Sequence, residues 1–182
     1  MAPSAGAVQL AGGVTVMAPF GIGAEPACDV TIVCGGPGWP AAARDPAVQA
    51  WLRSLPASSV ASVCTGALIL GAAGVLDGRM ATTRRRAVGA ETDAPLALLG
   101  QSGTVRTIEA AIVEDGGVVT GGGVSLAIDA TLYLLGRIYG EAAARAVAEV
   151  IEYDRAWAAN KAALGWRDEQ ARGAHDPART AR

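Results

Sequence analysis

The segment that most constrains the fold runs from residue 60 to residue 70 and reads VASVCTGALIL. A β-prone run ends on Cys64, turns through Thr65-Gly66 and continues as an apolar, helix-prone run with no loop between. This is the sequence form of a nucleophile elbow, a sharp strand-to-helix turn with a reactive side chain at its corner. A thiol there lies beside the first amides of the helix, and the positive end of the helix dipole favours the thiolate. The alternative is a structural cysteine buried in the turn, since unpaired cysteine often behaves as a small hydrophobe.

Strand and helix signals alternate along the chain, which is typical of an α/β fold. The 182 residues suit one domain, and 51% hydrophobic but only 4% aromatic residues suit short helices on a buried parallel sheet. We expect strands near residues 29–34, 59–63, 79–83, 104–108, 111–113 and 118–120, and helices near residues 45–55, 65–73, 125–139 and 141–153.

One domain is expected over residues 1–155. Its N-terminal segment, residues 1–28, is irregular, and residues 8–17 within it form either a hairpin or an irregular edge segment. Residues 156–182 are polar and basic, and we expect a mobile C-terminal tail there. Asp45-Pro46 is typical of the N-cap and first position of a helix.

Charge and composition exclude several classes of protein. A formal net charge of −2 gives no electrostatic basis for binding nucleic acid or an anionic membrane surface. No apolar stretch reaches the roughly 20 residues needed to span a bilayer, and the N-terminus lacks the pattern of a secretory signal. Three cysteines without metal-ligand spacing, and a single histidine, His175, in the tail, indicate a reduced, cytoplasmic protein with no metal or cofactor.

Two glycine-rich segments are expected beside Cys64. Gly35-Gly36-Pro37-Gly38 follows the strand that precedes the cysteine strand, and parallel sheets place their sites at the carboxyl ends of adjacent strands. Glycines there let backbone N–H groups approach a ligand and form an oxyanion hole, or they simply make a tight turn. Gly121-Gly122-Gly123 ends a strand at the same edge, and we expect mostly a packing role for it.

Several short motifs occur together in an order and spacing that resemble the ThiJ/PfpI family of the class I glutamine amidotransferase-like superfamily. Within that family the similarity is to isonitrile hydratases and to the ligand-binding halves of AraC-type regulators. It covers about residues 30–154, and the motifs are Gly35-Gly36-Pro37-Gly38, Ser62-Val63-Cys64-Thr65-Gly66-Ala67, Gly71-Ala72-Ala73-Gly74, Ala81-Thr82-Thr83, Glu114-Asp115-Gly116, Thr120-Gly121-Gly122-Gly123 and Ile151-Glu152-Tyr153-Asp154.

The resemblance implies a flavodoxin-like three-layer sandwich with a mostly parallel sheet, in a protein that is usually a homodimer acting on a small molecule. It implies that Cys64 is the reactive residue, with Gly35, Gly36, Thr65 and Gly66 forming the oxyanion and substrate-binding loop. In isonitrile hydratases the thiolate attacks the terminal isocyanide carbon, and the resulting thioimidate is hydrolysed to an N-substituted formamide.

Three features depart from the family pattern. Family members begin with a strand and a helix that carry an acidic residue, which hydrogen-bonds the cysteine. This first βα unit has no match here. Glu25 and Asp29 are the only carboxylates before residue 30, and neither follows a strand in the way the family pattern requires. Cys34 replaces a proline, and we expect a buried strand cysteine there rather than a disulfide with Cys64. His175 is not expected to reach the thiol.

The third departure is an arginine run, Arg84-Arg85-Arg86, where the family has His-Trp after the Ala81-Thr82-Thr83 motif. A Cys-His dyad through that position is therefore excluded, which argues against protease or amidase chemistry. Such a run is usually a solvated surface patch. The alternative is that Arg84 binds an anionic substrate group or favours the thiolate of Cys64.

The sequence thus supports two functions. One is a cysteine-dependent small-molecule enzyme resembling isonitrile hydratase, with a pathway-specific hydration or cyclisation as a variant. The other is a non-catalytic, ligand-sensing or regulatory domain of the same fold, which the missing acid and histidine favour. The C-terminal tail lacks the length and pattern of a helix-turn-helix module, so the chain itself is not expected to bind DNA.

Overall fold

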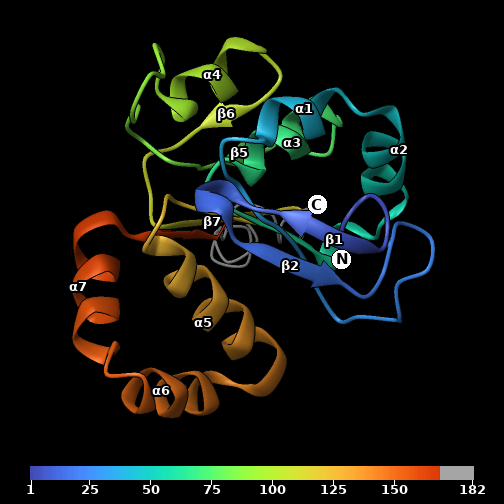
Figure 1. Cartoon of the computed structure of the whole chain (residues 1–182). Helices are drawn as coiled ribbons and strands as arrows, with labels where there is room; N and C mark the ends of the chain where they lie inside the picture. Colours follow the sequence, from blue (N-terminus) through green and yellow to red (C-terminus); the bar gives the residue numbers. More distant parts are fainter. Residues whose placement is uncertain (169–182) are drawn as a thin grey trace, which may run out of the picture.

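A five-stranded sheet runs through the middle of the molecule and carries the cysteine strand near its centre (Figure 1). The computed structural model describes residues 1–168. In spatial order the strands are β3 (Thr31–Val33), β4 (Val60–Val63), β8 (Val118–Gly121), β7 (Ile112–Asp115) and β9 (Trp166–Asp168). The first three are parallel, β7 is antiparallel to β8, and β9 is parallel to β7. The prediction of a mostly parallel sheet in an α/β fold is confirmed.

Helices cover both faces of this sheet, which makes three layers (Figure 1). One side carries α1 (Trp39–Arg44), α2 (Pro46–Ser54), α3 (Gly66–Ala72) and α4 (Pro95–Gln101), and the other carries α5 (Leu126–Tyr139), α6 (Glu141–Val150) and α7 (Asp154–Leu164). All four residues of both β4 and β8 are buried, because helices pack on each face of these central strands. This explains their mostly apolar character, with Ser62 and Thr120 as the buried polar exceptions.

Two smaller β structures flank the central sheet. The antiparallel strands β1 (Gly6–Gln9) and β2 (Thr15–Ala18) form a hairpin whose turn contains a 3₁₀ segment, η1 (Ala11–Gly13). Residues 8–17 therefore adopt the hairpin alternative. The parallel pair β5 (Met80–Ala81) and β6 (Arg106–Thr107) forms the second, and the 3₁₀ segment η2 (Ala57–Ser59) leads into β4.

The segment after residue 155 corrects a prediction. Residues 156–168 were expected in a mobile polar tail, but they form most of α7 and all of β9. Trp166 pairs with Ile112 in the sheet and packs edge-on against Tyr133, with ring centroids 5.1 Å apart. Two tryptophans, together with Leu164 and several alanines, supply enough apolar surface to order the segment. Residues 169–182, including His175, lie outside the described part of the chain.

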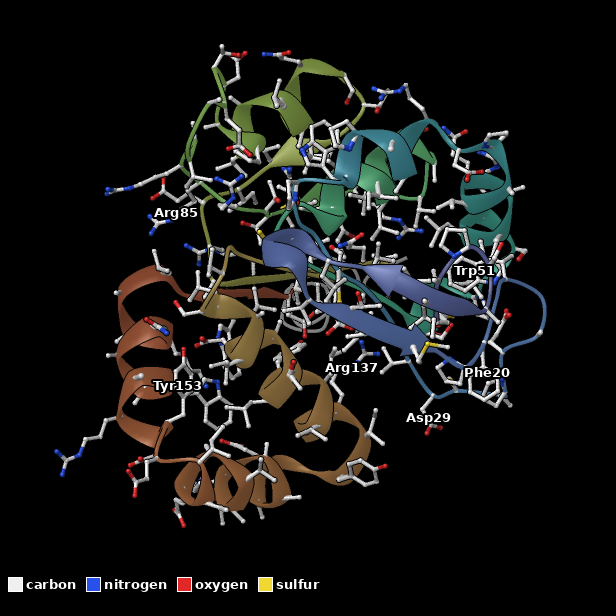
Figure 2. The ribbon with its side chains drawn as sticks, in the orientation of Figure 1. Phe20, Asp29, Trp51, Arg85, Arg137 and Tyr153 are labelled. Atoms are coloured by element: carbon white, nitrogen blue, oxygen red, sulfur yellow. The ribbon has the colours of Figure 1, made fainter. Side chains whose placement is uncertain are left out.

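A buried polar cluster fixes α7 against α5. Tyr153 lies between these helices (Figure 2) and donates to Oδ2 of Asp129 over 2.8 Å, while the Asn160 amide donates to the same oxygen over 3.1 Å. Burial raises the pKa of Asp129 above its ordinary value, although both hydrogen bonds act in the opposite direction. The cluster therefore joins α7 to the domain through Asp129, whose side chain is fully buried.

Helix boundaries follow the predicted signals in some places only. Oδ1 of Asp45 accepts from the N–H groups of Ala47 and Val48, so the predicted N-cap of α2 is confirmed. Helices α1 and α4 were not predicted, because each is short and lies beside glycine and proline residues that usually indicate loops. Within residues 1–168, no helix is long and apolar enough to cross a membrane.

Candidate active site

Cys64 is the first residue of a two-residue corner, Cys64-Thr65, between β4 and α3, and it is partly exposed. Its φ angle is +53°, a left-handed conformation that non-glycine residues rarely adopt and that costs about 1–3 kcal/mol. Two contacts hold the corner: the Cys64 N–H donates to the carbonyl of Gly122 over 3.0 Å, and the Thr83 hydroxyl donates to the Cys64 carbonyl over 2.5 Å. The sharp strand-to-helix turn expected from the sequence is present.

Close backbone contacts place the loop after β3 against this corner. A Cβ atom on Gly66 would lie only 1.9 Å from the carbonyl oxygen of Val33. A Cβ on Gly35 would lie 2.4 Å from Oγ1 of Thr65. Both positions therefore require glycine for a close approach of two backbone segments. The structure thus brings Gly35, Thr65 and Gly66 together with Cys64.

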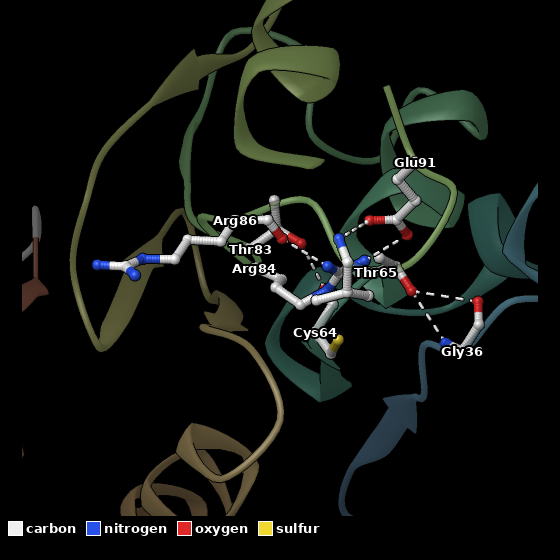
Figure 3. A network of polar contacts seen from close by, with 8 residues as sticks. Gly36, Cys64, Thr65, Thr83, Arg84, Arg86 and Glu91 are labelled. Carbon is white, nitrogen blue, oxygen red and sulfur yellow. Dashed lines mark hydrogen bonds and ion pairs between the residues drawn. The ribbon is translucent and has the colours of Figure 1, made fainter. Parts of the chain in front are cut away.

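The Thr65 hydroxyl holds the second glycine of the loop. The Gly36 N–H donates to Oγ1 of Thr65 over 2.9 Å, and the hydroxyl lies 3.4 Å from the Gly36 carbonyl oxygen (Figure 3). Gly36 has a φ of +135°, which turns its N–H toward the elbow. Because this N–H already has an acceptor, Gly36 shapes the loop, and an incoming anion would have to compete with Thr65 for it.

Arg84 is buried beside Cys64, with a relative exposure of 8%. Its guanidinium donates to the carboxylate of Glu91 and to the carbonyl of Arg86, each over 2.5 Å (Figure 3). The hydrogen bond to Glu91 raises the pKa of Arg84 above its ordinary value; burial opposes this, and the Cys64 side chain contributes in the raising direction. A Cβ on Gly123 would lie 2.4 Å from Cγ of Arg84, so the glycine makes room for the arginine stem.

The three consecutive arginines have three different environments, which corrects the expectation of one solvated patch. Arg84 faces the site, Arg85 is half-buried at the periphery and pairs with Glu109, and Arg86 is exposed and extends away from Cys64 (Figures 2 and 3). The three residues follow the short strand β5 and lie outside regular secondary structure, so no common face is imposed on their side chains.

A cavity of about 760 Å³ opens above Cys64. Its polar lining includes Cys64, Thr65, Arg84 and Glu91, and its apolar walls come from α1, α4 and three loops. The main apolar side chains are Pro37, Trp39, Pro40, Val88, Leu98 and Val124. A mostly apolar cavity with a few polar groups at one end is typical of a small-molecule site.

The remaining candidate groups lie outside the cavity lining or already have a hydrogen-bond partner. Cys34 is exposed and is not a buried strand cysteine; it follows the edge strand β3, and its thiol faces the Ile32 carbonyl. Glu25 accepts from the indole N–H of Trp51 on α2 over 2.7 Å. No group of three or more histidine, cysteine, aspartate or glutamate side chains positioned for a metal ion occurs in residues 1–168.

Reasoning from the sequence did not identify four residues that lie at this site: Trp39, Thr83, Glu91 and Val124. Thr83 belongs to a recognised motif, so its position could have indicated a contact with the elbow. Trp39 was hidden because α1 was not predicted. Glu91 and Val124 lie in loops, where only the three-dimensional structure brings them to the cavity.

A comparison with known families assigns the chain to a family. The model of the DJ-1/PfpI family matches residues 1–136. The chain belongs to the DJ-1/PfpI family. An isonitrile hydratase from Pseudomonas putida is 38% identical over 130 residues, which cover 70% of this chain and 53% of that protein. The chain spans about half the length of the curated relatives it matches.

Solved structures agree with this assignment. A ThiJ/PfpI family protein from Pseudomonas syringae superposes with a TM-score of 0.68 at 28% identity, covering 85% of this chain and 62% of that one. An AraC family transcriptional regulator from Pseudomonas putida superposes with a TM-score of 0.57 at 23% identity, covering 80% and 75% of the two chains. The second similarity shows the fold alone. The predicted family and fold class are confirmed.

The close contact at Gly66 yields a stability prediction. Gly66→Ala would force a methyl group into the Val33 carbonyl, so we expect a loss of about 3 kcal/mol or more in the free energy of unfolding. The matched control is Gly38→Ala, whose Cβ meets no atom within 4 Å and whose φ of −79° suits alanine. It should change stability by less than about 0.5 kcal/mol. Urea unfolding measures both, and equal stabilities would contradict the packing described here.

Proposed function

We propose that this chain is a cysteine-dependent enzyme of the isonitrile hydratase type, which hydrates an isocyanide or a related electrophilic carbon to an N-substituted formamide. The observation that carries the proposal is Cys64 itself: a strained corner residue that opens onto an apolar cavity next to a buried arginine. The 38% identity to an isonitrile hydratase supports the same reaction class.

In the proposed reaction the Cys64 thiolate attacks the terminal isocyanide carbon and forms a carbon–sulfur bond. A proton from water then completes a thioimidate, in which nitrogen is double-bonded to the CH carbon that carries sulfur. A second water adds to that carbon, and the thiolate leaves as the nitrogen takes up a proton, which releases the formamide. The hydroxide left by the first water takes up the proton that the adduct loses as its carbonyl forms. One water is therefore consumed overall and the thiolate is regenerated, in keeping with covalent catalysis in two easier steps.

Arg84 supplies a fixed positive charge in this scheme. Its guanidinium lies beside the Cys64 side chain, and it cannot act as the acid, because an arginine whose pKa is raised stays protonated. The N–H groups of Thr65 and Gly66 begin α3 and would stabilise charge in the addition steps, each by a few kcal/mol. Gly35 and Gly36 shape the opposite wall.

A second function is favoured by one observation. Glu91 is the carboxylate at the site that we considered as a proton donor. Arg84 and the Val88 N–H both bind it, however, and lower its pKa. The carboxyl group is thus held in the charged form, which suits a ligand-sensing domain better than an acid catalyst. We therefore expect slow turnover if the chain is an enzyme.

We also propose that the working form is a homodimer. The hairpin exposes a group of apolar side chains, Val14, Val16 and Met17, whose relative exposures reach 71%. Exposed apolar clusters of this kind favour association. Light scattering at micromolar concentration should report twice the mass of the chain, and a monomer that does not bind the dye ANS would contradict the proposal.

The assay for function is formamide production from a small alkyl or aryl isonitrile. Wild type should form the product slowly, and Cys64→Ala should fall to the uncatalysed rate because the nucleophile is gone. Cys34→Ala is the matched control, since Cys34 is a free, exposed cysteine outside the cavity lining, and it should keep wild-type activity. Activity that survives in Cys64→Ala would contradict the covalent mechanism. Inactivity of wild type with a small molecule retained in native mass spectrometry would favour the binding domain.

A further inference from the structure

A second residue at the Cys64 cavity has a strained backbone. Val124 has a φ of +47°, and a β-branched side chain in this region is a genuine outlier. Within residues 1–168, three non-glycine residues have positive φ angles: Cys64, Val124 and Glu152. The first two line the same cavity, whereas Glu152 follows the end of α6.

The surrounding contacts hold Val124 in this conformation. Just before it, Gly122 donates to the carbonyl of Ala111 over 2.9 Å and accepts from the Cys64 N–H, which joins the segment to the sheet and to the elbow. Just after it, the Val124 carbonyl accepts from Ala127 over 3.1 Å as α5 begins. The loop is fixed on both sides, so a change in the loop cannot easily relieve the strain.

Contacts within the protein do little to offset the backbone strain at Val124. Val124 is 73% exposed, so its strain is not offset by burial in the core. Glycine would adopt the same φ without strain and occupies the three preceding positions. Strain of this kind, at a site, indicates a functional role for the side chain. What the valine adds over glycine is an apolar surface at the cavity.

The other walls of the cavity indicate which kind of ligand would contact Val124. Trp39 and Leu98 are apolar, and the guanidinium of Arg84 is already engaged by Glu91. An anionic group on the substrate would therefore have to displace Glu91, whereas a neutral apolar group could pack against the existing walls. Burying apolar surface of both the ligand and Val124 favours such a ligand.

We propose that Val124 is a specificity-determining residue, and that the cavity accepts neutral electrophiles that carry a bulky apolar substituent on a nitrogen near the reacting carbon, a branched or cyclic alkyl or aryl group. The reaction class rests on the proposed function, but the choice of substituent does not. Arg84 then acts on the thiolate and does not bind a substrate anion.

The test compares two maleimides that differ only in their substituent, N-methylmaleimide and N-cyclohexylmaleimide. Their alkylation rates at Cys64 are measured by peptide mapping, which separates Cys64 from the exposed Cys28 and Cys34. Relative to a free thiol, wild type should prefer the cyclohexyl reagent. Val124→Gly should lower this preference by about fivefold to tenfold, the effect of removing one small apolar contact. Its melting temperature should stay equal or rise, since glycine relieves the strain.

Glu152→Gly is the matched control, because it relieves a positive φ outside the cavity lining and should leave the reagent preference unchanged. Val124→Asn is a second variant, since asparagine tolerates this conformation and lacks the apolar surface; it should also lower the preference. An unchanged preference in both Val124 variants, or an equal change in Glu152→Gly, would overturn the inference. If wild type hydrates no isonitrile but the preference falls as expected, the proposed reaction fails and the specificity role stands.

Discussion

The left-handed turn at Cys64 is the constraint on which the rest of the site depends. A strand and a helix can meet without a loop only if the corner residue adopts the left-handed conformation. That geometry brings the first turn of α3 so close to β3 that Gly66 has no room for a side chain. It also leaves the Cys64 N–H and carbonyl to be satisfied by Gly122 and Thr83, which come from two other segments. The corner thus determines where four separate parts of the chain lie.

A buried ion pair sets the electrostatics of the site. Arg84 is nearly inaccessible to solvent, and its pairing with Glu91 compensates the cost of removing its charge from water. Removing only one partner of such a pair leaves an uncompensated charge, so the two residues function as a unit. The result is a guanidinium, paired with a carboxylate, beside a thiol that faces a cavity with mostly apolar walls. This combination suits a neutral substrate attacked by a thiolate.

The sequence predicted those features that are set by local patterns. Alternating apolar runs indicated the α/β fold, Asp45-Pro46 the start of α2, and the Cys64 segment the elbow. The predictions were wrong where tertiary contacts, rather than local composition, determine the structure. Two tryptophans order residues that read as a polar tail, and the environment of Arg84 depends on Glu91, a loop residue seven positions away. The left-handed φ of Val124 has no local signal, since valine is among the residues that least favour it.

Rapid-quench mass spectrometry during the first turnovers with cyclohexyl isonitrile tests the central claim most directly. The account predicts a peptide containing Cys64 whose mass is increased by one intact isonitrile molecule, the thioimidate, and slower formation of this adduct in Arg84→Met, where the charge that favours the thiolate is lost. Formamide released with no adduct on Cys64 at any time, or adduct formation at the wild-type rate in Arg84→Met, would contradict it.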